Sequence, residues 1–235
     1  MNTQDIAVCT QNDIWYPKSL LEIKKAPSKL FYMGDIGILN RCRGVAVIGT
    51  RKASSYGLEI ARKIGQMAAD SELIVINGLA IGCDTASLEG AISQNGKCVV
   101  VLPCGLDQIY PKSNDELAEK ILEHGGCLIS EYDQGITPQK NCFIDRDRIQ
   151  SGLSNGIIIV ESDETGGTMH TANFAQKQYR RIACYYSNLL EHMSGNKYLV
   201  ESGKGEMLKK MEDVQVFMNR ILNDEEYEQM TFGFK

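Results

Sequence analysis

The sequence lacks an apolar run near the roughly 20 residues that a bilayer span requires, and it lacks a basic start followed by an apolar stretch. We therefore expect no membrane association and no secretion signal, and a cytoplasmic location. It also lacks a CxxC pair among its eight cysteines, and the three histidines do not cluster with them. That spacing disfavours zinc, so reduced thiols that pack as small apolar side chains are expected, with no metal and no cofactor.

An excess of positive charge is missing as well. Lys and Arg total 25 against 30 Asp and Glu, which gives a formal net charge of −5. This balance disfavours a protein whose whole surface binds nucleic acid, so any such site has to be a local groove built by a few placed cations. The 235 residues, 43% of them hydrophobic, suffice for one domain with small appendages.

From residue 44 onward, short apolar runs alternate with segments of helical period. Strands are predicted over residues 44–50, 73–78, 97–103, 127–130, 156–162 and 181–186. Helices are predicted over residues 54–70, 83–96, 114–126, 145–154 and 167–178, with Ser54 or Ser55 capping the first and Asn114 the third. Strands that are apolar on both faces indicate an α/β fold, namely a doubly wound, mainly parallel, extended Rossmann-like sheet with helices on both faces.

The chain divides into three predicted parts. Residues 1–40 form a lead-in that covers one sheet edge, residues 41–205 form the Rossmann-like domain, and residues 206–235 form a helix with a polar tail. In such folds ligands bind outside the carboxyl ends of the strands, so the loops after the strands hold the candidate site.

The loop GTRKASSYG joins the first strand to the first helix, where free backbone N–H groups favour anions. Gly49 permits a close turn, Thr50 and Ser54 offer hydroxyls, and Arg51 and Lys52 add charge. The motif is neither GxGxxG nor a P-loop. The alternative is a capped turn with solvated charges.

The segment QKNCFIDRDRIQSGLS interleaves an aromatic residue with cations: Lys140, Phe143, Arg146 and Arg148. This combination suits single-stranded nucleic acid, because bases stack on the ring while cations hold the phosphates. The alternative is that Phe143 is core and the arginines pair with Asp145 and Asp147.

Weaker candidates follow other strands. Gly166, Gly167 and Thr168 form a second anion-ready helix start, and Gly78 lies in a tight turn. Asn196 is expected to cap a helix, and Lys197 to face the same groove. Tyr110 either stacks on a base or packs on its own loop, and His170 has no catalytic partner, so no catalytic residue is assigned.

In order and spacing, VAVIGTRKASSYG, NGLAIGCDTAS, VLPCGLDQIYPKSNDELAEKI, FIDRDRIQSGLSNGIIIVES and GGTMHTA resemble the DprA/Smf DNA-processing family, of the Rossmann-like SLOG type. The resemblance implies a homodimer that binds single-stranded DNA in a basic pocket and loads a RecA-type recombinase during natural transformation. It carries over the phosphate-binding turn and the basic, stacking and arginine positions: Gly49, Thr50, Arg51, Lys52, Lys140, Phe143, Arg146 and Arg148.

The chain departs from that family at three positions, where Ile81 replaces a basic residue, Ser87 a histidine and Asp147 an asparagine. One alternative is therefore a nucleotide-binding or nucleotide-hydrolysing Rossmann protein, for which Glu161 and Asp163 are the best carboxylates. Another is an interaction protein of a mobile-element or phage-defence system. The leading expectation is a binding protein rather than an enzyme.

Overall fold

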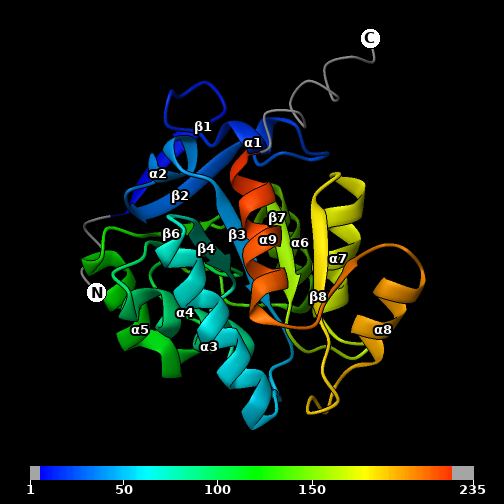
Figure 1. The fold of residues 1–235 in the computed structure, drawn as a ribbon. Helices are drawn as coiled ribbons and strands as arrows, with labels where there is room; N and C mark the ends of the chain where they lie inside the picture. The colour runs from blue at the N-terminus through cyan, green and yellow to red at the C-terminus, as the bar shows by residue number, and fades with distance from the viewer. Residues whose placement is uncertain (1–5, 224–235) are drawn as a thin grey trace.

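The computed structural model describes residues 6–223. They form one nine-stranded sheet of order β1-β2-β6-β5-β4-β3-β7-β8-β9 (Figure 1). The strands are β1 (Ala7–Thr10), β2 (Lys29–Gly34), β3 (Gly44–Ile48), β4 (Ile74–Asn77), β5 (Cys98–Leu102), β6 (Cys127–Ser130), β7 (Gly156–Ile159), β8 (Arg181–Tyr185) and β9 (Glu206–Leu208). The helices are α1 (Lys18–Leu21), α2 (Ile38–Arg41), α3 (Ser55–Asp70), α4 (Cys83–Ser93), α5 (Asp115–Glu123), α6 (Lys140–Leu153), α7 (Thr168–Lys177), α8 (Ser194–Glu201) and α9 (Met211–Asn223).

In the order of the sheet, the strands β6-β5-β4-β3-β7-β8-β9 are parallel to one another, and β1 and β2 add an antiparallel edge next to β6. From β3 the chain winds outward to β6, and it then returns to place β7 on the other side of β3. The predicted doubly wound fold is therefore confirmed. The reversal leaves a crevice between the carboxyl ends of β3 and β7, where open α/β sheets bind ligands.

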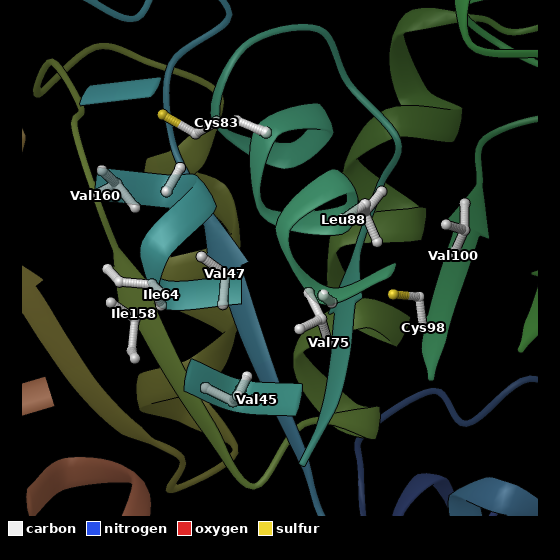
Figure 2. Close-up of a cluster of buried hydrophobic side chains, with 14 of the residues drawn as sticks. Val45, Val47, Ile64, Val75, Cys83, Leu88, Cys98, Val100, Ile158 and Val160 are labelled. Atoms are coloured by element: carbon white, nitrogen blue, oxygen red, sulfur yellow. The ribbon is translucent and has the colours of Figure 1, made fainter. Parts of the chain in front are cut away.

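Both faces of the sheet are covered, because successive residues of a strand point to opposite sides. Val45 and Val47 of β3 join the core under α3 and α4, whereas Ala46 and Ile48 join the core under α7. Figure 2 shows Ile64 of α3 between Val47 of β3 and Ile158 of β7. In Figure 1, α3, α4 and α9 lie in front of the sheet, and α6 and α7 lie behind it.

Helices α3 and α4 meet with their backbones in close contact. A Cβ at Gly65 would lie 2.0 Å from the Ser87 carbonyl oxygen, and one at Gly90 would lie 2.1 Å from that of Arg62. Only glycine permits this approach. The contact fixes how α3 lies against α4.

Three details differ from the sequence prediction. Helix α6 begins at Lys140 rather than at residue 145. The sequence pattern did not show this start, because most of the buried residues of the helix are polar and give no apolar period. The lead-in residues pair directly with β6 through β2. Asn114 does not cap α5 with its side chain, which instead donates to the Leu79 carbonyl and to the Thr85 hydroxyl, both at 2.8 Å. The predicted polar tail, residues 224–235, lies outside the described residues.

Within residues 6–223, no helix has the length and apolar character needed to cross a bilayer. The same part of the chain contains no group of three side chains arranged as metal ligands. All eight cysteines are free thiols, and seven of them are buried.

Candidate nucleic-acid interface

A pocket of about 710 Å³ opens in the crevice between β3 and β7. Its walls come from the β3–α3 loop, the first three turns of α6, and the loop that joins β7 to α7. Of the predicted site residues, the lining includes Gly49, Thr50, Arg51, Lys52, Lys140, Phe143, Arg146, Gly166, Gly167 and Thr168. Segments far apart in the sequence thus meet where the topology places a binding site.

Three cations stand at the rim of the pocket. Arg51 and Lys52 come from the turn after β3, and Lys140 comes from the first residue of α6. All three are exposed, and none forms an ion pair with another residue in 6–223. Thr50 shapes the turn, because its backbone N–H donates to the Glu161 carbonyl at 2.7 Å and its hydroxyl accepts from the Lys52 N–H at 3.2 Å. The rim therefore offers charge to a polyanion without first breaking a salt bridge.

Phe143 lines the pocket beside Arg51 rather than packing in a hydrophobic core. Its ring is partly exposed, with its centroid 5.4 Å from that of Tyr110 at an interplanar angle of 71°. The Arg51 guanidinium lies over the ring, 5.4 Å from the centroid. Tyr110 also lines the pocket, so the two rings form an aromatic corner beside the cations. Such a corner can stack a base while the cations hold phosphates.

The floor of the pocket is polar and buried. Arg146 is 7% exposed, its Nη1 donates to the Val101 carbonyl at 3.3 Å, and its Nε lies 3.0 Å from Asp147 Oδ1 in an ion pair without hydrogen-bond geometry. A Cβ at Gly78 would come within 1.1 Å of Arg146 Nη1. Gly78 is therefore needed to make room for the arginine. Gly78 itself, a predicted binding residue, does not line the pocket.

Two floor carboxylates are affected by burial. Asp84 accepts from the Gly78 N–H at 3.1 Å. Burial raises the pKa of Asp84 to about 6, and the Arg146 guanidinium opposes that rise. Burial also raises the pKa of Asp147, again opposed by Arg146. Because Arg146 is shared by two acids, it contributes less positive charge to a ligand than the rim cations do.

Several predicted binding residues do not line the pocket. Arg148 points elsewhere, is 6% exposed, and donates to Glu131 Oε2 at 2.6 Å. Asn196 is fully buried and donates to backbone carbonyls of Ile159, Val160 and Tyr185, so it neither caps α8 nor reaches a ligand. Neither side chain lines the pocket and each donates to internal partners, so the structure does not bring these two predicted binding residues to the site.

Ser54 and Lys197 are also outside the lining. Ser54 caps α3, as expected, by accepting from the Gly57 N–H at 3.0 Å, and it is buried. Lys197 is exposed on α8. Ile81 is exposed outside the pocket, and Ser87 is a buried residue of α4, where its hydroxyl donates to the Asp84 carbonyl at 2.9 Å.

Glu161 is buried and fully engaged. Its Oε2 accepts from the Ser54 N–H and hydroxyl, both at 3.0 Å, and its Oε1 accepts from the N–H groups of Glu191 and His192 at 2.8 and 2.9 Å. It does not line the pocket and has no free position for a substrate proton. Asp163 does line the pocket, and its Oδ2 lies 2.8 Å from His192 Nδ1.

The floor also contains residues that sequence reasoning missed, notably Gln150 and Thr171. The missed signal is helical phase. On α6, Phe143, Arg146 and Gln150 are spaced by three and four residues, which places them on one face, whereas Arg148 lies about 200° around the helix from Arg146.

Comparison with known proteins identifies the family. Residues 7–219 match the family described as DNA recombination-mediator protein A. The chain belongs to this family. It is 35% identical over 192 residues to the DNA processing protein DprA of Streptococcus pneumoniae, covering 81% of this chain and 67% of that one. It is 34% identical over 176 residues to protein Smf of Synechocystis, covering 74% of this chain but only 44% of that relative.

Solved structures of recombination-mediator A proteins have the same fold. The crystal structure of S. pneumoniae DprA superposes with a TM-score of 0.82 at 33% identity, covering 91% of this chain and 74% of that one. DNA processing protein A of Helicobacter pylori, whose structure addresses its single-stranded DNA binding mode, gives a TM-score of 0.81 at 29% identity, covering 92% and 96%.

Proposed function

We propose that this recombination-mediator A protein binds single-stranded DNA in the pocket between β3 and β7, and that it acts by binding rather than by catalysis. The observation that carries the proposal is the rim. Three cations that have no salt-bridge partner within residues 6–223 line the pocket together with a partly exposed phenylalanine, at the switch point of the sheet. Phosphates along a single strand meet the cations, and an unpaired base stacks against Phe143.

The wider role follows from the family. The protein would hold incoming or processed single strands and assist loading of a RecA-type recombinase, in natural transformation or recombination, as a homodimer. The single-stranded DNA binding reported for the H. pylori relative supports the ligand. The recombinase and the dimer are proposed on family membership alone.

Nucleotide hydrolysis is less well supported by the site. All four hydrogen bonds to the Glu161 carboxylate come from the protein itself, so Glu161 is not available as a base. Of the two carboxylates that the sequence offered for hydrolysis, only Asp163 is left as a candidate, and its Oδ2 is in contact with His192 Nδ1.

The test is fluorescence anisotropy of a labelled single-stranded oligonucleotide, compared with its duplex, in the presence and absence of mononucleotides. Tight binding of the single strand, weak binding of the duplex and no nucleotide turnover are expected. Nucleotide turnover without DNA binding would reject the proposal in favour of a hydrolase.

A further inference from the structure

The floor of the pocket contains an amide that opens onto the pocket and has no hydrogen bond to the described residues. Gln150 is 2% exposed and lines the pocket, and its amide is not among the fully enclosed side-chain atoms that lack a partner, so the polar end of the side chain faces the pocket. A ligand that displaces water from such a group has to replace its hydrogen bonds, because an unmade bond costs free energy. An amide at the bottom of a ligand pocket therefore points to a hydrogen-bonding partner on the ligand.

Its position on α6 relates the amide to the aromatic ring. Phe143 and Gln150 are seven residues apart, two turns along the same helix face, about 10.5 Å along the axis. Between them, Arg146 and Asp147 are paired with each other. Gln150 is therefore the neutral hydrogen-bonding side chain on the face that Phe143 begins, and a base that stacks on the ring can direct one edge at the amide.

The chemistry of the amide matches one edge of every base. A glutamine amide presents a donor and an acceptor side by side. The Watson–Crick edge of each of the four bases also offers a neighbouring donor and acceptor, and rotation of the amide lets it meet either order. In a duplex that edge is already paired, whereas in a single strand it is open to proteins.

We infer that Gln150 is the residue that selects single strands over duplex, by hydrogen-bonding the Watson–Crick edge of an unpaired base stacked on Phe143. This inference rests on the proposed function. Because the amide accepts either order of donor and acceptor, the selection carries no base preference.

The first experiment removes the contact from the side of the protein, by changing Gln150, or from the side of the DNA, by removing the base. Gln150→Met keeps the length of the side chain and loses both hydrogen-bonding groups, so single-strand affinity should fall about tenfold while duplex affinity is unchanged. With the wild-type protein, an oligonucleotide that bears abasic sites should bind more weakly than the intact one binds Gln150→Met, because it loses the stacking on Phe143 as well as the hydrogen bonds. Removing the bases should cost the Gln150→Met protein about tenfold less than it costs wild type, because the variant has only the stacking left to lose. Gln176→Met is the matched control, since it makes the same change at a glutamine whose Nε2 is buried without a partner but which lies outside the pocket.

The second experiment changes the pattern of the contact. Gln150→Glu presents acceptors only, and guanine alone offers two neighbouring donors on its Watson–Crick edge. The variant should therefore prefer guanine-containing oligonucleotides, whereas wild type is indifferent. Melting curves for both variants check that they are folded.

The outcomes separate the two proposals. Failure of the wild-type protein to bind any single strand would overturn the proposed function, and this inference with it. If wild type binds single strands but Gln150→Met binds them equally well and Gln150→Glu gains no guanine preference, the pocket binds DNA and the role of Gln150 is wrong.

Discussion

The dependence of DNA binding on salt follows directly from the rim of the pocket. Arg51, Lys52 and Lys140 are exposed there and have no salt-bridge partner among the described residues, whereas Arg146 is balanced by Asp147. For single strands, log K falls with log salt by about 0.7 for each phosphate neutralised. Three phosphates give a slope of about −2, so raising the salt from about 50 to 200 mM should weaken binding about 20-fold per site.

The same reasoning fixes what each cation contributes. Changing any one of the three to alanine should reduce the slope by about 0.7, and the triple variant should bind with almost no salt dependence. Lys63→Ala is the matched control, because Lys63 is exposed on α3, pairs with Glu59 and lies outside the pocket.

Anisotropy titrations of a labelled oligonucleotide at four or more salt concentrations measure these slopes. A slope near −2 that persists in the triple variant would mean that the phosphates are neutralised elsewhere, and the assignment of the rim would be refuted. An equal loss in Lys63→Ala would indicate a diffuse effect of net charge instead.

Further predictions concern stacking, pH and stability. Phe143→Leu should lose about 1–3 kcal/mol of single-strand binding while its melting temperature stays close to that of wild type, since the ring lies at the pocket and outside the core; a large fall in melting temperature would show a packing role. The folded-state pKa of Asp84, about 6, exceeds its ordinary 3.8, so the folded protein binds this proton more tightly than the unfolded chain does. As pH rises from 4 to 6, the free energy of unfolding of wild type should therefore fall by up to about 3 kcal/mol relative to that of Asp84→Asn. Urea denaturation measures both, and the same pH dependence in the two proteins would contradict this prediction. Glu161→Gln should lower the free energy of unfolding by about 3 kcal/mol, because an amide nitrogen then faces two of the four donors that the carboxylate accepts; urea denaturation measures it, and an unchanged midpoint would argue against this network.

The parallel sheet could be predicted because its strands are short, apolar runs that do not depend on distant context. The five residues of β3 are all buried, as are those of β5, and each is followed by a turn and a helix. The β3–α3 turn could also be predicted as an anion-binding site, because a glycine, a hydroxyl and two cations at the start of a helix all favour a bound anion.

The floor of the pocket could not be predicted in the same way. Helix α6 buries Arg146, Asp147, Arg148 and Gln150, and buried polar residues give no hydrophobic period from which its start could be found. Two arginines two positions apart look equivalent in sequence but face nearly opposite directions on a helix. Asn196 looked like a cap because its three carbonyl partners come from strands that only the fold brings near.

The antiparallel edge of the sheet has a consequence for the order in which the chain can assemble. Strands β1 and β2 pair with each other, but Phe31 of β2 pairs with Ser130 of β6, so this pair cannot join the rest of the sheet until about a hundred further residues have been made. By contrast, β3, β4 and β5 pair with neighbours close behind them, and these local units can form early. We therefore expect the β1–β2 pair to be the last part of the sheet on the β6 side of β3 to dock, and its docking closes the layer against which α1 and α6 pack.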